Sequence, residues 1–186
     1  KTVNHGSNGS TTFTAATGYH YKSVSGTGCS VSDNTVTASS VTANVTCTVT
    51  FEINSYTVTF KSNNTSYGTV TDASKTVNHG GSVSTTFAAK TNYHYKSVSG
   101  TGCSVSGTTV TASNVAGNVT CTVTFAIDTH TVTFKVNNAN YGSVTDATKT
   151  VNHGSNGSTT FTAATGHHYA SVSGTGCSVS GTTVTA

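Results

Sequence analysis

The stretch VSGTGCSVSGTTVTASNVAGNVTCTVTF, residues 98–125, contains two of the five cysteines and recurs along the chain. An earlier copy, residues 24–51, reads VSGTGCSVSDNTVTASSVTANVTCTVTF, and a third begins at Val172 and reaches Ala186 before its second cysteine. Apolar and hydroxylated residues alternate around the cysteines, which is the two-residue period of a half-buried β-strand. The stretch therefore predicts β-structure that the chain uses more than once.

The repeat period follows from the hexapeptide KTVNHG, which begins at Lys1, Lys75 and Lys149. The spacing is 74 residues in both cases (75 − 1 and 149 − 75), so the 186 residues hold about two and a half copies. We place the domain boundaries near Ser55 and Thr129, where YTVTF and HTVTF follow the end of the preceding strand. Residues 55–128 are then a complete repeat, residues 1–54 a partial repeat that lacks its first strands, and residues 129–186 a partial repeat that lacks its last strand.

The composition predicts an all-β fold. Leu, Arg, Gln, Met, Trp and Pro are absent and Glu occurs once, so most strong helix formers are missing, whereas Thr, Val, Ser, Tyr and Phe are abundant. We expect tandem small β domains, β-grasp-like or sandwich-like, of about 74 residues each. The linkers EINSY and AIDTH contain no flexible Gly/Ser or Pro run, so we expect the domains to form a stiff rod. The lack of an initiator Met and of a signal peptide fits a mature or excised segment.

The two-residue period predicts strands at residues 57–62, 68–77, 82–90 and 93–98, a tight hairpin at 103–113 and a closing strand at 118–126. Val58 and Phe60 share one face, as do the alternate residues of 83–89 and of 119–127. In the first-copy hairpin, the turn SDNT places Val31 opposite Val36 and Cys29 opposite Ala38. Cys29 is therefore predicted to face the core.

The cysteines form two pairs with the same spacing. Cys29 and Cys47 are 18 residues apart, as are Cys103 and Cys121, and each lies on the apolar face of its strand. We expect a disulfide within each repeat that joins the hairpin to the closing strand. Zinc is the competing interpretation, but it favours four ligands at CxxC-like spacing, and no such spacing occurs. Cys177 has its expected partner beyond the end of the sequence.

The remaining polar residues give little indication of chemistry. Each copy has a histidine in VNHG and another before a tyrosine: His5, His79, His153, His20, His94 and His168. No recurring acid or free cysteine accompanies them, so we expect loop and solvent-facing histidines, with no metal, no cofactor and no catalytic residue. The eight lysines are scattered and no arginine occurs, which argues against nucleic-acid binding. No apolar run is long enough for membrane insertion.

Surface modification and recognition have several candidate positions. Asn-x-Ser/Thr sequons make N-glycosylation a possibility at Asn44, Asn118, Asn8, Asn63, Asn64 and Asn156. Asn44 and Asn118 are equivalent positions that point outward by strand parity, and glycans on Ser or Thr are a comparable possibility. The aromatic segments offer recognition candidates at Tyr19, Tyr21, Tyr93 and Tyr95. Two outward rows of alternate threonines begin at Thr120 and at Thr46.

The order of these segments resembles a known family. The TVTF opening strand at residues 57–60, the VNHG turn, the YHY segment, the GCSVSGTTVTA hairpin and the closing NVTCTVTF are similar to the divergent internalin-B-type B-repeat. The resemblance covers essentially the whole chain and implies a small β domain used in tandem as a spacer, stalk or adhesive element of bacterial surface proteins, with no catalytic residues. Many members have Pro after the Phe strand, where this chain has Ala16 or Lys90.

Together these features predict a structural protein rather than an enzyme. We expect a disulfide-stabilised tandem array in an extracellular or cell-surface stalk or filament, because near-identical copies with short linkers and low charge can pack against copies of the same chain. The alternative is an adhesin-type binding module that recognises carbohydrate or another surface.

Overall fold

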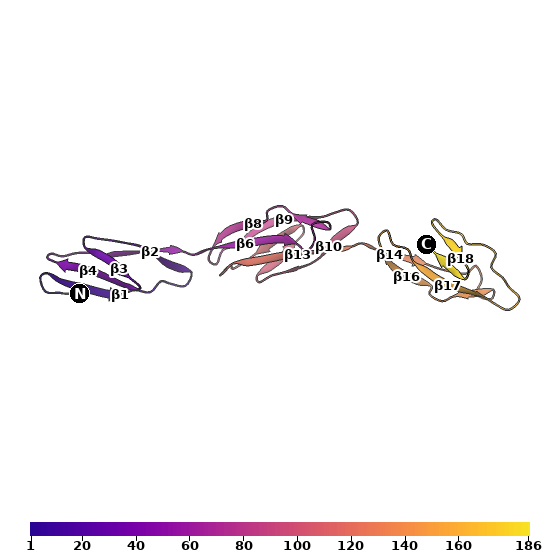
Figure 1. Ribbon diagram of the computed structural model, residues 1–186, viewed down its shortest axis with the longest axis horizontal. Coiled ribbons are helices and arrows are strands. Elements are labelled where there is room, and N and C mark those ends of the chain that lie inside the picture. Colours follow the sequence, from indigo (N-terminus) through magenta and orange to yellow (C-terminus); the bar gives the residue numbers. More distant parts are fainter. The chain divides into compact units, whose positions relative to one another are not determined.

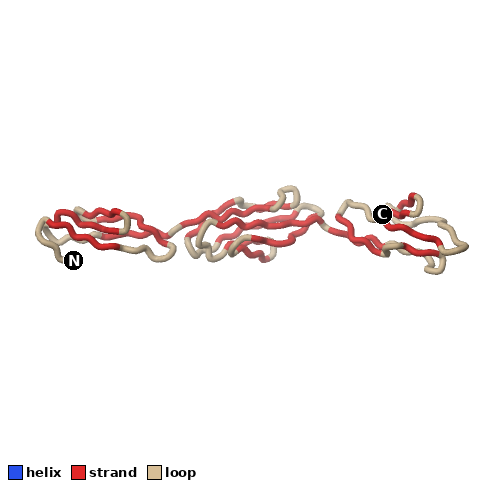
Figure 2. Tube along the Cα trace, turned by 60° about the horizontal axis from the view of Figure 1, so that its bottom comes forward, coloured by secondary structure: helices blue, strands red, loops and turns tan.

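The computed structural model describes all 186 residues, and all of its regular secondary structure is β-strand (Figure 2). The all-β prediction is therefore confirmed. The chain contains no helix of the length and apolarity needed to cross a bilayer. It divides into two compact units, the first formed by residues 1–63, 69–88 and 97–124 and the second by residues 64–68, 89–96 and 125–186.

The strands follow the 74-residue repeat (Figure 1). The first copy contains β1 (Ser7–Thr12), β2 (Tyr19–Ser25), β3 (Cys29–Ser32), β4 (Thr35–Val41) and β5 (Thr48–Ile53). The middle copy contains β6 (Ser55–Ser62), β7 (Gly68–Val70), β8 (Ser74–Asn78), β9 (Val83–Ala89), β10 (Tyr93–Ser99), β11 (Cys103–Ser106), β12 (Thr109–Ala112) and β13 (Val119–Ile127). The third copy contains β14 (Thr129–Thr133), β15 (Gly142–Val144), β16 (Thr148–Asn152), β17 (Ser158–Ala163), β18 (Ser178–Ser180) and β19 (Thr183–Thr185).

The middle copy has two four-stranded sheets, in the orders β10-β13-β6-β8 and β11-β12-β9-β7. The first and last strands of the copy, β6 and β13, are parallel neighbours in the centre of the first sheet, with Val58 opposite Val119 and Phe60 opposite Cys121. A parallel pair needs a long crossover between its strands, and here the intervening strands supply it. The first copy has the sheets β2-β5 and β1-β4-β3, and the third has β14-β16 and β15-β17-β19-β18.

The core of the middle copy is made by the alternating residues of both sheets. Val58, Phe60, Cys121, Val123 and Phe125 of the first sheet are 0–2% exposed. The second sheet adds Phe87, Val110 and Ala112, together with the buried hydroxyl of Thr85. The predicted faces are therefore correct, except that Ala89 at the end of β9 is exposed although it shares the parity of Phe87.

The prediction of one strand over residues 68–77 is wrong, because this segment forms β7 and β8, which belong to different sheets. The break is at residues 71–73, where side chains and backbone bind β9. The Thr71 and Thr86 hydroxyls are 2.6 Å apart, and the Asp72 N–H donates to the Thr85 hydroxyl at 3.0 Å. Partners 13 and 15 residues away thus redirect the chain, which local periodicity does not reveal.

The hairpin prediction holds in detail. In β3 and β4, Cys29 is opposite Ala38 and Val31 opposite Val36, and the equivalent pairs recur in β11 and β12. Only the first central residue of each turn has positive φ, 51° at Asp33 and 57° at Gly107, as in type II′ turns. This turn fixes the register that directs the cysteine into the core.

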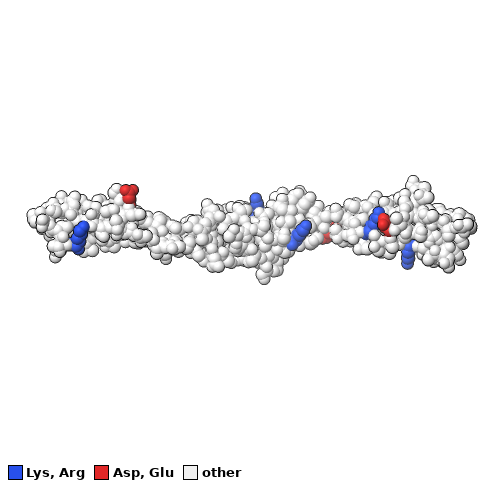
Figure 3. All heavy atoms as spheres, turned by 90° about the horizontal axis from the view of Figure 1, so that it is seen from below, with Lys and Arg blue, Asp and Glu red and all other residues white.

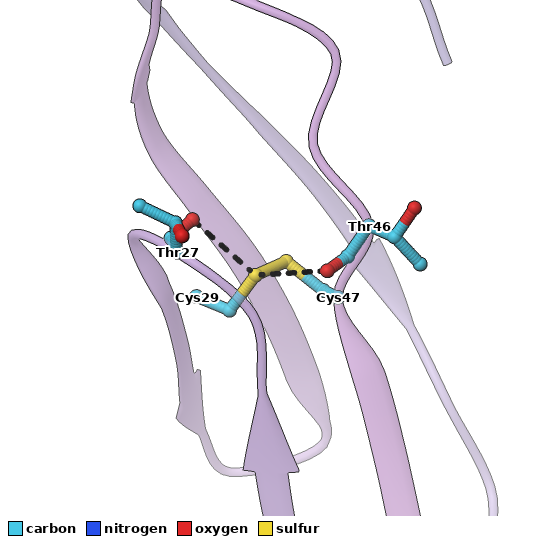
Figure 4. Close-up of a disulfide and its surroundings, with 4 residues drawn as sticks. All are labelled: Thr27, Cys29, Thr46 and Cys47. Carbon is cyan, nitrogen blue, oxygen red and sulfur yellow. Dashed lines mark hydrogen bonds between the residues drawn. A yellow bond between two sulfur atoms is a disulfide. The ribbon is translucent and has the colours of Figure 1, made fainter.

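Disulfides join the two sheets within a copy. Cys103 on β11 bonds Cys121 on β13, and Cys29 on β3 bonds Cys47 just before β5, with Cα atoms 5.7 Å apart in both pairs. Both predicted disulfides are therefore present in the structure, and Cys177 is a free, half-buried thiol. The sulfur of Cys29 also lies 3.7 and 3.9 Å from the carbonyl oxygens of Thr27 and Thr46 (Figure 4). A disulfide sulfur has no hydrogen to donate, so these are close packing contacts.

A glycine makes room for each disulfide. Gly100 has a φ of 127°, and a Cβ there would lie 2.2 Å from the Thr120 carbonyl oxygen and 2.7 Å from the Cys103 sulfur. Gly26 is in the same position against Thr46 and Cys29. The SGTGC sequence therefore brings the backbone directly against the sulfur, which no residue with a side chain could do without displacing the strand.

We expect replacement of the Cys103 and Cys121 pair by serine to lower the free energy of unfolding of the middle copy by about 3 kcal/mol, because the closed loop no longer restricts the unfolded chain. Chemical denaturation, monitored through hydrogen exchange of the backbone amides in β6 and β13, measures this loss of free energy of unfolding. The matched control is Cys177→Ser, which removes a thiol but no bond and should leave the middle copy unchanged. Equal stability of the double variant and this control would contradict the prediction.

Candidate functional site

The repeats meet at two equivalent junctions, each centred on one linker residue. The Asn54 N–H donates to the Gly18 carbonyl of the first copy at 2.8 Å, and its carbonyl accepts from the His79 N–H of the next copy at 2.8 Å. Asp128 makes the same two bonds, to Asn92 and from His153, each at 2.8 Å. The first junction lies within the first compact unit and the second within the second. One residue thus binds both neighbours through its backbone.

The side chain of the linker residue adds a third bond. The Asn54 Oδ1 lies 2.7 Å from the Nδ1 of His20, and the Asp128 Oδ1 lies 2.8 Å from the Nδ1 of His94. An amide or carboxylate oxygen only accepts, so the histidine Nδ1 carries the hydrogen in both cases. Both histidines are exposed, as the sequence predicted. The sequence did not predict their hydrogen bonds to the linker residues.

Around the linker residue, the two junctions differ at the positions of Gly18 and Tyr56. At the first, the His79 ring packs over Gly18, whose added Cβ would lie 2.2 Å from the ring, and its centroid is 6.0 Å from that of Tyr56. At the second, Asn92 takes the glycine position with a φ of 69° and a histidine, His130, replaces the tyrosine. There His130 Nε2 lies 3.1 Å from the Nδ1 of His153. His130 has no histidine counterpart in the middle copy, so the recurring sequence pattern does not reveal this pair.

Charged side chains form small local pairs. On the face in Figure 3 the lysines stand apart from one another. Lys22 bonds Glu52 at 2.6 Å on the surface, and this bond holds the pKa of Glu52 below its ordinary value. In the middle copy, Ala126 stands at the position of Glu52, and in the third copy Ala170 stands at the position of Lys22. The pair is therefore particular to the first copy.

Asp72 is part of a recurring structural cluster. Lys75 bonds its carboxylate at 2.8 Å and the Thr85 hydroxyl donates to it at 3.0 Å. Asp146, Lys149 and Thr159 repeat the ion pair and the backbone bond in the third copy. The hydrogen bond from Lys75, followed by that from Thr85, lowers the pKa of Asp72. This cluster holds the turn between β7 and β8 against β9.

The tyrosines proposed for recognition have different environments. Tyr19 and Tyr21 are 46% and 36% exposed, although the Tyr21 ring lies 5.6 Å from that of Phe13. Tyr93 stacks on Tyr67 at 4.5 Å, and both Tyr93 and Tyr95 are half-buried. Residues 1–54 do not include a counterpart of Tyr67, the ring that covers Tyr93 in the middle copy.

The asparagines of the sequons are all exposed: Asn8, Asn44, Asn63, Asn64, Asn118 and Asn156. Three of them also order the backbone through their side-chain oxygens, since Asn118 accepts from the Thr57 N–H, Asn8 from Ser40 and Asn64 from Ser66. Glycans attach through the amide nitrogen, so this acceptor role does not exclude modification, and glycosylation stays a prediction.

No group of three or more His, Cys, Asp or Glu side chains is arranged to hold a metal ion. His5 lines a surface hollow of the first copy, and His167 and His168 line another in the third copy. At the two junctions, backbone and side-chain bonds connect consecutive repeats.

We expect Asp72→Asn to reduce the acid sensitivity of the middle copy. A lowered carboxyl pKa in the folded state contributes stability that is present above the ordinary value, near pH 4, and is lost as the pH falls through the folded value. The unfolding midpoint of the variant should therefore fall less between pH 5 and pH 2 than that of the unmodified chain, measured by denaturant titration at each pH. Ser82→Ala, at an exposed and non-titrating position of the same copy, is the control and should keep the original pH slope. Parallel slopes for the unmodified chain and Asp72→Asn would refute this role.

Comparison with known proteins agrees with the repeat structure. A family model described as the divergent InlB B-repeat domain matches residues 1–55 and again residues 56–129. No match is found among curated proteins or among solved structures. The two matched segments meet at the first junction and together span more than half of the 186 residues. The chain therefore belongs to the divergent InlB B-repeat family.

Proposed function

We propose that this chain is a structural repeat segment of an extracellular stalk or filament protein. The observation that carries the proposal is the bonded linker residue at each junction. Asn54 and Asp128 each bind the preceding copy and the following copy through their own N–H and carbonyl groups. A spacer role requires such continuity from one domain to the next.

The linkers leave little slack between copies. β5 ends at Ile53 and β6 begins at Ser55, while β13 ends at Ile127 and β14 begins at Thr129. A single residue separates the strands at each junction, in contrast to the long Gly/Ser tracts that give flexible joints. This connection favours a spacer that transmits position from one copy to the next.

The disulfides support an extracellular or cell-surface location. Structural disulfides persist in oxidising compartments and are rare in the cytosol. A domain of about 74 residues also buries little apolar surface, so a covalent bond contributes a large part of its stability. Family membership and this chemistry point to the same setting, in which copies of the same chain are the proposed partners.

The proposal predicts that copies on either side of a junction tumble together. Backbone ¹⁵N relaxation should give one shared, anisotropic rotational correlation time for the middle and third copies of the unmodified chain. Insertion of Gly-Gly-Ser-Gly-Gly-Ser after Asp128 should shorten the correlation time of both copies, because the Asn92 and His153 bonds can no longer form together.

The same hexapeptide inserted after Gly117, in the loop between β12 and β13, provides the control, since a Cβ at this glycine would meet nothing within 4 Å. It should leave the shared correlation time unchanged. If the unmodified chain already shows the short, separate correlation times of the Asp128 insertion, the spacer role is wrong. Electron microscopy of the native material then tests for stalks or filaments, and isolated flexible monomers would count against them.

The second candidate function is an adhesin-type module that binds carbohydrate, with Tyr19 and Tyr21 on β2 as its candidate residues, although the equivalent Tyr93 and Tyr95 of the complete copy are half-buried. Aromatic faces that stay accessible to solvent are able to stack on sugar rings. The exposed threonines Thr46, Thr48 and Thr50 lie on or next to β5, which pairs with β2. Tyr19 and Tyr21 lie opposite Ile53 and Phe51 in this sheet, so the tyrosines and the threonines are on its two different faces.

This alternative predicts binding to at least one glycan on an array, with a loss of at least tenfold in the variant that carries both Tyr19→Ser and Tyr21→Ser. Tyr141→Ser, which removes an equally exposed tyrosine that stacks on His167, is the control and should retain binding. A blank array with the unmodified, folded chain would eliminate the alternative.

A further inference from the structure

His130 and His153 form an exposed pair at the second junction. His130 lies on β14 and His153 directly follows β16, its pairing partner. The Nε2 of His130 is 3.1 Å from the Nδ1 of His153, and the ring centroids are 5.3 Å apart with a tilt of 57°. Two ring nitrogens at this distance share one hydrogen. One donates it, and the other accepts it with its lone pair.

This geometry is close to that of two ligands on one metal ion. Zinc binds imidazole nitrogen at about 2.0–2.1 Å, and a tetrahedral angle then separates two such nitrogens by about 3.3 Å. The two nitrogens are thus within a few tenths of an ångström of this separation, and a rotation of the rings that turns both lone pairs toward one ion would complete the geometry. Both side chains are exposed, so water has access to the remaining coordination positions.

The position of His153 is fixed by the backbone. Its N–H donates to the Asp128 carbonyl, and His130 lies two residues after Asp128 in the neighbouring strand. The β14–β16 ladder, with His130 opposite Val151, holds both Cα atoms. The pair is therefore positioned before an ion arrives, which reduces the entropy lost on binding.

The first junction lacks the same arrangement. Tyr56 occupies the position of His130, and a neutral phenol binds Zn²⁺ much more weakly than a neutral imidazole does. His79, equivalent to His153, packs over Gly18, and its Nδ1 is buried without a hydrogen-bond partner. Asn92 replaces that glycine at the second junction, where the His153 ring is exposed.

We propose that His130 and His153 form a two-histidine site for a borderline divalent transition-metal ion such as Zn²⁺. Imidazole is the ligand that Zn²⁺, Cu²⁺ and Ni²⁺ share, whereas Mg²⁺ and Ca²⁺ prefer oxygen. With two protein ligands and water in the other positions, the ion exchanges readily. Its binding connects β14 to the turn after β16, next to the linker bond of Asp128.

The test titrates ZnCl₂ into the whole chain carrying Cys177→Ser, so that the free thiol cannot bind the ion. Calorimetry should show one site, and ¹⁵N spectra of the imidazoles should show the largest changes at His130 Nε2 and His153 Nδ1. His130→Tyr, which reproduces the first junction, and His153→Gln should each weaken binding at least tenfold. MgCl₂ should give no heat.

His94→Gln is the matched control, because His94 lies at the same junction but bonds Asp128. It should change zinc affinity by less than about twofold. An unchanged thermal midpoint without metal verifies that each variant is folded. Zinc affinity that survives His130→Tyr, or equal losses in all three variants, would overturn the two-histidine site, as would no binding by the folded starting chain.

Discussion

The bond between the two sheets of a repeat is the constraint on which the rest of the structure depends. Cys103 and Cys121 come from different sheets, and Gly100 lies so close to them that a side chain at its position would overlap sulfur and backbone. The type II′ turn at Gly107 sets the hairpin register that brings Cys103 inward. Turn, glycine and cysteine therefore act as one unit, and all three recur in the repeated sequence.

The junctions extend this local order from one repeat to the next. Asn54 and Asp128 use their N–H, carbonyl and side-chain oxygen in the same three bonds, although one side chain is neutral and the other charged. The backbone part of the junction thus tolerates variation around it. The variation is concentrated at the rings, where Tyr56 and His79 at one junction become His130 and His153 at the other.

Strand parity predicted the faces, the hairpin register and the disulfides, because each depends on residues close in sequence or on a repeated pattern. The break between β7 and β8 was not predictable in this way, since it is made by Thr71 and Asp72 binding residues 13 and 15 positions away. The histidine pair was missed for a similar reason. His130 has no histidine at the equivalent position of the preceding copy, and only the fold brings it to His153.

The parallel pairing of β6 with β13 has a mechanical consequence. β6 begins the middle repeat and β13 ends it, so a pull applied at the two ends slides these neighbouring strands along each other. In that direction the hydrogen bonds between them carry the load together, instead of breaking one after another as they do when strands are peeled apart. If the strands do separate, the segment between Cys103 and Cys121 stays closed and cannot be drawn out. Under such a pull, the strand pair would resist extension first and the disulfide would limit it afterwards.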